Sequence, residues 1–293
     1  MSSRSRLISP LRRKLLACAA TAPFFPSLRA EARTLLIGTT PVFLDDQATF
    51  LDAWRRYIEQ RMGVPVRFVQ RREYREVVEL LLRGGLDFAW ICGYPFVKNK
   101  QWLNLVATPV YRGQPLYQSY LIVARNDRMT RDIRNLRGTV HAFSDPNSNS
   151  GWLVPHVQMI RLGLEANGFF RKSFFTWAHR KSVESVAVGL SHGASVDGYV
   201  WDTLQRTHPD MTSATRVAQK SDSYGFPPIV AARHVSAETW QAMQNLLREM
   251  AHNPQGRALL ARLNLDGFTH GDPALYTGIE RNIALLDTAH ASA

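Results

Sequence analysis

The sequence is poor in cysteine and has no long hydrophobic run. Its 293 residues include only two cysteines, Cys18 and Cys92. So few thiols cannot supply a disulfide framework, and the fold must therefore be held together by its hydrophobic core. The apolar run Leu15–Phe25 is shorter than the roughly 20 residues needed to cross a bilayer. We therefore expect no membrane anchor.

Signatures of catalysis and of metal binding are also scarce. Ser150 does not lie in a G-x-S-x-G elbow, and the chain has no Walker loop, no H-E-x-x-H and no paired-cysteine zinc spacing. The nine histidines are scattered along the sequence. We expect a protein that is not an enzyme, with no catalytic residues, no metal and no cofactor.

Acidic residues are in deficit. Lys and Arg number 36 against 24 Asp and Glu, giving a formal net charge of +12. Such a balance favours anionic partners. The basic cluster at Arg71, Arg72 and Arg75 lacks the exposed aromatic residues of a nucleic-acid module. We expect a small anion as the partner and no nucleic acid.

The N-terminus has the form of an export signal. Basic residues precede the apolar run, and residues 30–32 read A-x-A, as before a signal-peptidase cut. We expect residues 1–32 to be a signal peptide, which leaves 30 basic and 23 acidic residues in a periplasmic protein. The pair Arg12-Arg13 keeps both the general secretory and the twin-arginine routes open. Cys92 is then the sole mature cysteine.

From residue 33 onward, short β-rich runs alternate with amphipathic stretches, the pattern of parallel sheets with crossover helices. We expect strands over residues 34–39, 65–70, 88–92, 103–111, 117–125, 139–144, 175–179, 196–201 and 229–232. We expect helices over residues 47–62, 74–83, 150–167, 182–190, 237–250 and 273–286. The fold class is α/β.

The order of these elements predicts two lobes. We place residues 33–124 and 224–293 in the first lobe and residues 125–223 in a second, inserted lobe. Two chain crossings between similar α/β lobes make a hinge, and a ligand cleft is expected between the lobes.

The loop over residues 143–155 carries the most chemistry. It ends an apolar strand with polar residues and then opens a helix, whose first N–H groups lack internal partners and lie at the positive end of the helix dipole. Ser148, Asn149 and Ser150 add side-chain donors there, and Gly151 lets an anion approach the backbone. The alternative is structural, because Ser and Asn are also common helix N-caps.

Taken together, three segments resemble a known family. They are the run Tyr117–Val123, the run Ile133–Gly138 and the loop Asp145–Pro155, supported by residues 85–89 and the surroundings of His179 and Asp197. In this order they resemble the phosphate-, phosphite- and phosphonate-binding proteins of ABC importers. The resemblance covers nearly all of the mature chain. It implies a type II periplasmic binding protein fold, which agrees with the two-lobe prediction.

The resemblance also implies site residues. The family's Ser-x-Ser-Gly anion cradle falls on Ser148, Asn149, Ser150 and Gly151, with Asn149 where the family usually has Thr. It implies further donors from two tyrosines and a histidine, namely Tyr74, Tyr117 and His179. His179 could act as a neutral donor or, when protonated, as a charge partner.

Two departures from the family bear on the ligand. Relatives that take aminoalkyl phosphonates use additional carboxylates, where this chain has Leu204 and the apolar run 229–232. Asp197 lies nearby and is a possible ligand-binding residue, although a structural turn explains it better. A bare oxyanion, or one with an apolar substituent, is therefore expected.

The second departure is a thiol. Cys92 and Tyr94 follow a strand at the edge where open α/β sheets bind ligands, which makes both possible ligand-binding residues. A pocket thiol suits a soft ligand such as arsenite, whereas a lone buried cysteine is more commonly a small hydrophobe.

The expected mechanism is capture of the anion by hinge closure. A monomer would deliver the ligand to an ABC permease. The alternative is an oxyanion sensor that reports to a membrane histidine kinase.

Overall fold

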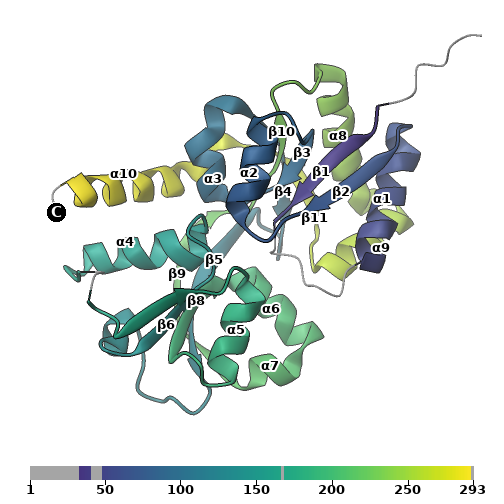
Figure 1. Ribbon diagram of the computed structural model, residues 1–293. Helices are drawn as coiled ribbons and strands as arrows, with labels where there is room; N and C mark the ends of the chain where they lie inside the picture. The colour runs from purple at the N-terminus through teal and green to yellow at the C-terminus, as the bar shows by residue number, and fades with distance from the viewer. Residues whose placement is uncertain (1–32, 41–47, 166–167, 292–293) are drawn as a thin grey trace, which may run out of the picture. The chain divides into compact units, whose positions relative to one another are not determined.

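The computed structural model describes residues 33–40, 48–165 and 168–291 (Figure 1). The expected signal peptide lies outside the described residues. The strands are β1 (Leu35–Thr39), β2 (Val66–Gln70), β3 (Phe88–Trp90), β4 (Leu103–Val110), β5 (Leu116–Ala124), β6 (Val140–Phe143), β7 (Lys172–Phe175), β8 (Gly193–Asp197), β9 (Thr215–Gly225), β10 (Ile229–Ala232) and β11 (Gly267–His270).

The α-helices are α1 (Ala48–Met62), α2 (Tyr74–Leu82), α3 (Gly93–Asn99), α4 (Val154–Arg161), α5 (His179–Ala187), α6 (Gly198–Thr207), α7 (Pro209–Ser213), α8 (Ala237–Glu249), α9 (Pro254–Leu263) and α10 (Thr277–Ala291). Short 3-10 helices are η1 (Lys100–Trp102), η2 (Ile133–Leu136), η4 (Met250–His252) and η5 (Pro273–Tyr276). A π-helical turn, η3 (Asn149–Leu153), leads into α4.

The first sheet has the order β11-β4-β10-β3-β1-β2. Strands β1, β2 and β3 are parallel, whereas β10 is antiparallel to β3 and β4. Helix α2 contacts β1, β3 and β10, while α1 contacts both α8 and α9 on the other side of the strands (Figure 1). Helix α1 buries Phe50, Leu51, Trp54, Tyr57 and Ile58, the apolar positions whose spacing predicts it.

The second sheet has the order β7-β6-β8-β5-β9. Strand β6 is parallel to β7 and β8, and β5 is antiparallel to β8 and β9. Helices α5 and α6 contact β5 and β8, and α4 lies across the sheet from them (Figure 1). The α/β class and the two-sheet architecture are as expected.

The chain crosses between the sheets twice, as predicted. One crossing, through residues 111–115, joins β4 to β5, and the other, through residues 226–228, joins β9 to β10. The expected boundaries after residues 124 and 223 are wrong with respect to sheet membership. Strand β5 pairs with β8 and β9, so residues 116–124 belong to the second sheet. The apolar pattern of β5 would fit either sheet, and strand pairing is not encoded locally.

Between residues 172 and 225 the elements differ most from the prediction. Strand β7 ends at Phe175, and His179 opens α5 instead of ending a strand, because Trp177 adopts a positive φ of 65° and breaks the extended run. Asp197 ends β8 and begins α6, where a strand to residue 201 was expected. Strand β9 was not predicted, because it is mostly polar and is partly exposed at the edge of the sheet.

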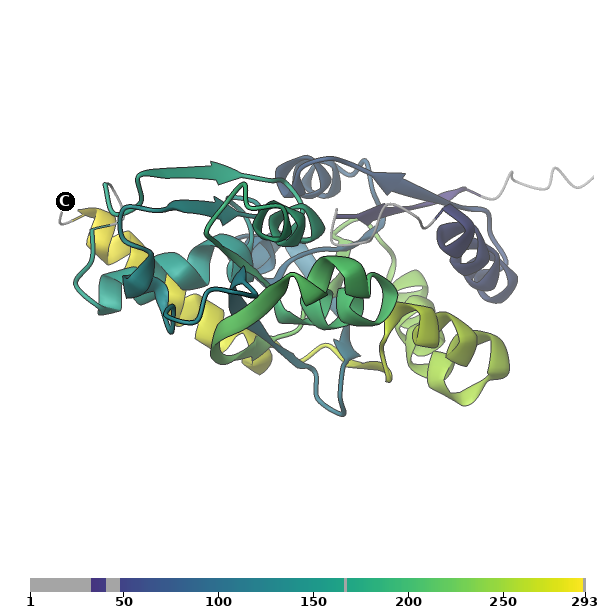
Figure 2. The ribbon, with the colours of Figure 1, turned by 90° about the horizontal axis from the view of Figure 1, so that it is seen from below.

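Helix α10 runs beside α4 in both ribbon views (Figures 1 and 2). Arg161 Nη2 on α4 donates to Asn282 Oδ1 on α10 at 3.0 Å. The C-terminal helix therefore packs against the layer that covers the second sheet. Among the described helices, none combines the length and the apolar character required to span a bilayer.

Candidate functional site

Polar residues gather where the parallel strands of both sheets end. In the first sheet, Tyr74 follows β2 and Cys92 follows β3. In the second sheet, Ser144 follows β6, His179 follows β7 and Asp197 ends β8. The carboxyl ends of parallel strands are where open α/β sheets bind ligands.

The helix that follows β6 opens with a widened turn. Ser148 is its N-cap, and the Ser148 hydroxyl oxygen accepts from the backbone N–H of Gly151 at 2.9 Å. The N–H of Leu153 reaches the carbonyl of Ser148 at 3.0 Å, the spacing of a π turn. Single π turns inside α-helices are frequent at functional sites.

Gly151 is required by close packing. A Cβ at this position would lie 1.8 Å from Ser144 Oγ, 2.8 Å from Ser144 Cβ and 3.1 Å from His179 Cε1. Because real Cβ atoms do not approach other atoms as closely as the two Ser144 distances, a side chain at this position would force Ser144 to move. Gly151 brings β6, η3 and α5 together.

Residues of the first sheet and of strand β5 reach the same turn. The backbone N–H of Asn149 donates to Cys92 Sγ at 3.2 Å, and Asn149 Nδ2 donates to the Tyr117 hydroxyl oxygen at 3.0 Å. The backbone N–H of Tyr74 donates to Asp145 Oδ2 at 3.1 Å. The nine residues Tyr74, Cys92, Tyr117, Ser144, Ser148, Asn149, Ser150, Gly151 and His179 are called the site cluster below.

His179 is a neutral donor. Its Nδ1 accepts from the backbone N–H of Asp197 at 3.1 Å, so the ring proton resides on Nε2, which lies 3.4 Å from Ser148 Oγ. Burial lowers the pKa of His179 to about 3. Of the two roles that the sequence left open, the neutral donor is the one that the geometry favours.

Several polar atoms of the site cluster are buried without a partner among the described residues. They are the Tyr74 hydroxyl, the Ser144 and Ser150 hydroxyls and the Asn149 Oδ1 atom. All four residues are at most 1% exposed. A buried polar atom without a partner costs about 1–3 kcal/mol, so four of them in one place call for an explanation by function.

The Cys92 thiol is protonated. Burial raises its pKa to about 11, although the hydrogen bond from the Asn149 N–H acts in the opposite direction. Since the thiolate is the nucleophile and the metal ligand, burial disfavours the reactive form of this thiol. The sequence left open whether Cys92 lies at the site, and the structure places its sulfur in contact with the Asn149 N–H.

Two buried carboxyl groups flank the site cluster. Asp197 accepts from the N–H groups of Tyr199 and Val200 at the start of α6, and burial raises its pKa to about 7. Asp145 accepts from the N–H groups of Tyr74 and Asn147, and burial raises its pKa. Asp197 is the structural turn residue that the sequence favoured, and it touches the cluster through the His179 ring.

Tyr94 turns its ring away from these contacts. The ring stacks on Trp152 at a centroid distance of 6.2 Å, and its pKa is raised by burial. Of the ten residues that the sequence singled out, Tyr94 is the one whose side-chain contacts lie outside the site cluster and its flanking carboxyls.

Sequence reasoning did not include Ser144 and Asp145 among the site residues. Both follow directly after β6, so the rule that ligands bind at the carboxyl ends of parallel strands could have found them.

Sequence reasoning also overlooked a formal G-x-S-x-G match at Gly189–Gly193. A nucleophile elbow leads from a strand into a helix, whereas this segment leads from α5 into β8. The Ser191 hydroxyl is hydrogen-bonded to that of Ser185 at 2.8 Å. The segment therefore lacks the context of an elbow.

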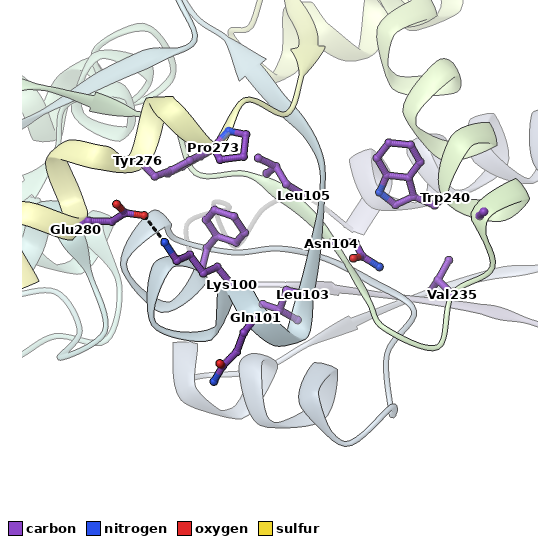
Figure 3. Close-up of a pocket in the computed structure, with 12 residues that line it drawn as sticks. Lys100, Gln101, Leu103, Asn104, Leu105, Val235, Trp240, Pro273, Tyr276 and Glu280 are labelled. Atoms are coloured by element: carbon purple, nitrogen blue, oxygen red, sulfur yellow. Dashed lines mark hydrogen bonds and ion pairs between the residues drawn. The ribbon is translucent and has the colours of Figure 1, made fainter.

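A pocket of about 630 Å³ lies elsewhere on the first sheet (Figure 3). Trp240 and Tyr276 line it, and Lys100 and Glu280 form an ion pair of 2.7 Å at its wall. No residue of the site cluster lines this pocket. In the part of the chain that the structure describes, no group of three or more His, Cys, Asp or Glu side chains is placed to hold a metal ion.

The model of a protein family covers most of the chain. The family is described as the periplasmic substrate-binding protein of the phosphonate ABC transporter, and its model matches residues 37–276. The chain belongs to this family. The resemblance read from the sequence is thus confirmed. Members of this phosphonate-binding family are substrate-binding components of transporters.

Individual relatives are distant. The chain is 26% identical over 160 residues to the phosphate-import protein PhnD of Mycolicibacterium smegmatis, a match that spans 51% of this chain and 49% of that protein. It is 23% identical over 245 residues to the phosphonates-binding periplasmic protein of Escherichia coli, spanning 80% of this chain and 72% of that protein.

Solved structures show the same fold. PhnD1 of Prochlorococcus marinus in complex with methylphosphonate superposes with a TM-score of 0.79 at 18% identity, covering 87% of this chain and 98% of that one. The type II periplasmic binding protein fold expected from the sequence is confirmed.

Proposed function

We propose that this protein captures a small phosphorus oxyanion of the phosphate, phosphite or phosphonate kind in the site cluster. The observation that carries the proposal is the group of buried, unpartnered polar atoms on Tyr74, Ser144, Asn149 and Ser150. A tetrahedral oxyanion has enough acceptor oxygens to pair with the three hydroxyls and with the Nε2–H of His179.

The donors are neutral and come from both sheets. Tyr74 belongs to the first sheet's helix α2, whereas Tyr117, Ser150 and His179 belong to the second sheet and its helices. An anion held between them replaces its hydration shell with fixed dipoles. Because only the assembled arrangement provides all of these bonds, the ligand favours closure of the two sheets upon it.

An ammonium-bearing ligand fits poorly. By the resemblance, Leu204 and strand β10 correspond to positions where aminophosphonate-binding relatives have carboxylates, and both are buried in the hydrophobic core. Asp197 is engaged by two backbone N–H groups at the start of α6. The ligand class proposed is therefore a bare oxyanion or one with a small apolar substituent.

The proposed setting follows from the family and the sequence. A protein exported through the signal at residues 1–32 would work in the periplasm as a monomer and deliver its ligand to an ABC permease, without turnover of its own.

Isothermal titration of the purified full-length protein tests the proposal. The panel is phosphate, phosphite, methylphosphonate, 2-aminoethylphosphonate, sulfate and nitrate. We expect one-to-one binding of a phosphorus oxyanion, weakened at least 10-fold in Ser150→Ala and unchanged in Ser213→Ala, a control on the exposed Ser213. Absence of binding to every member of the panel would refute it.

One observation favours a second candidate, an arsenite sensor that reports to a membrane kinase. Cys92 Sγ lies in the site cluster against the Asn149 N–H. A sulfur–arsenic bond requires loss of the thiol proton, which the raised pKa opposes. Binding of arsenite alone, abolished in Cys92→Ser, would establish this candidate in place of the first.

A further inference from the structure

The two ends of the Asn149 side-chain amide have different surroundings. Its Nδ2 donates to the Tyr117 hydroxyl oxygen at 3.0 Å, whereas its Oδ1 is buried without a partner among the described residues. The residue is 0% exposed. Since an amide oxygen can only accept, Oδ1 requires a donor that the described protein does not provide.

The other polar side chains of the site cluster discussed here are donors or are already occupied. The Tyr117 oxygen accepts from Asn149, which leaves its O–H free to donate. The Ser148 oxygen accepts from the Gly151 N–H, and the His179 proton is on Nε2. The hydroxyls can rotate to meet a ligand oxygen, but Asn149 Oδ1 cannot become a donor.

We infer that the site selects an oxyanion that carries an acidic O–H, and that Asn149 is the residue that reads this proton. The inference rests on the proposed function and deepens it. The ligand's ionised oxygens accept from the hydroxyls, and its remaining O–H donates to Asn149 Oδ1. Phosphate, phosphite and phosphonates keep such a proton near neutral pH, whereas sulfate and sulfonates do not.

An oxyanion without this proton would meet Asn149 Oδ1 with a second acceptor. Both oxygens would then be desolvated and unpaired, at a cost of about 1–3 kcal/mol each. Sites built to bond a ligand hydroxyl reject analogues that lack it strongly for this reason. Asn149, where the family usually has Thr, therefore determines specificity.

Several titratable groups face this part of the cluster. They are Tyr74 on α2, Cys92 before α3, Tyr117 on β5, Asp145 after β6, His179 on α5 and Asp197 at α6. Their charge affects the absolute affinity for any anion. At one fixed pH it affects two anions of equal charge and shape alike, so the ratio of the two affinities isolates the effect of the O–H.

The test uses a matched pair of equal charge at pH 6 with the purified full-length protein, methylphosphonate against methanesulfonate. Phosphate and sulfate form a second pair, which differs by one charge at this pH and therefore serves only to compare variants with wild type. In a pair that binds, we expect the affinity of wild type for the phosphorus compound to exceed that for the sulfur compound by at least about 100-fold. In Asn149→Leu the preference should fall about 10-fold or more, and Asn149→Thr, whose hydroxyl can donate or accept, should also narrow it.

Tyr74→Phe is the matched control, because it removes a donor instead of the acceptor. It should weaken both members of a pair by a similar factor and leave the preference unchanged. A preference that persists in Asn149→Leu, or equal affinities in wild type, would overturn the inference while leaving oxyanion binding intact. Failure of all four compounds to bind wild type would instead overturn the proposed function, and the inference with it.

Discussion

The protein contains two polar regions that both include buried tyrosine hydroxyls and that differ in whether their polar atoms have hydrogen-bond partners. In the site cluster, four polar atoms are buried with no partner among the described residues. In the second region, the Asp202 carboxylate accepts from the hydroxyls of Tyr111 and Tyr120 at 2.9 and 3.1 Å and pairs with Arg112 at 3.0 Å. These four residues, called the Asp202 cluster, tie the first crossing to helix α6.

The difference separates binding from structure. Each polar atom of the Asp202 cluster named above has a protein partner, so the cluster contributes to stability in its present form. The site cluster holds its hydroxyls at the expense of stability, which a ligand can recover. A tyrosine at the end of a strand therefore does not indicate a binding site by itself. Whether its hydroxyl has a hydrogen-bond partner within the protein distinguishes a structural role from a binding role.

The largest expected effect concerns the pH dependence at the edge of the site cluster. The pKa of Asp197 is raised to about 7 by burial, while in the unfolded chain it is near its ordinary value of 3.8. Between these pH values the folded protein binds the extra proton, so the contribution of this group to stability falls as pH rises through that window.

Chemical denaturation at pH 4 and pH 8 checks this sign. From pH 4 to pH 8, the free energy of unfolding of wild type should fall by up to about 4 kcal/mol more than that of Asp197→Asn. Asn is chosen because it keeps the helix N-cap without the charge. The depressed pKa of His179 and of His141 acts in both proteins and cancels. A difference no larger than that between wild type and Asp222→Asn, a change at an exposed site, would contradict the assignment.

The next effect should be confined to the Asp202 cluster. Asp202→Ala leaves the hydroxyls of Tyr111 and Tyr120 without their shared acceptor and should lower the free energy of unfolding by about 3 kcal/mol. Urea denaturation measures the loss. Calorimetry below the unfolding temperature of this variant should show ligand affinity within about threefold of that of wild type. A loss of binding without a loss of stability would contradict the structural role of the Asp202 cluster.

Crowding at Gly151 should lower both the stability of the protein and its affinity for the ligand. In Gly151→Ala, the new methyl group would collide with Ser144, so we expect a loss of about 2 kcal/mol in stability and at least a 10-fold loss in ligand affinity. Gly267→Ala is the control, because its Cβ would meet Ala251 at an ordinary 3.5 Å. Equal behaviour of the two variants in thermal denaturation and calorimetry would disprove the packing argument.

The smallest and sharpest test is a pair of identical substitutions. Tyr74→Phe removes an unpartnered hydroxyl and should leave stability unchanged or raise it by about 1 kcal/mol. Tyr111→Phe removes a hydroxyl that donates to Asp202 and should lower stability by about 1–2 kcal/mol. Both changes in the free energy of unfolding are measured by urea denaturation without ligand. If the two changes have the same sign, the clusters do not differ in the way described here.

The fold could be predicted from the sequence wherever the pattern was strong. The helix at 48–62 has a clear apolar face, and the alternation of strands and helices fixed the α/β class. Strand β9 could not be predicted, because an exposed edge strand needs few apolar residues. The partners of β5 depend on pairing between distant segments, which a local pattern does not specify.

The sequence indicated which residues of the site cluster lie close together, apart from Ser144, and it did not indicate their geometry. Ser148, Ser150 and Gly151 follow a strand and open a helix, a context visible in the sequence. The orientation of the Asn149 amide and the proton position on His179 depend on Tyr117 and Asp197, which come from other strands. Their roles emerge only when the strands of the second sheet are assembled.

Helix α6 joins the two polar regions. Asp197 at its start donates its backbone N–H to the His179 ring, and Asp202, about 7.5 Å further along, holds Tyr111 at the chain crossing. The Tyr199 hydroxyl also donates to the carbonyl of Leu263 on α9, beside the first sheet. One helix of ten residues therefore contacts both the His179 ring and the first chain crossing. We expect a displacement of His179 on ligand binding to be felt at that crossing, because the same short helix contacts both places.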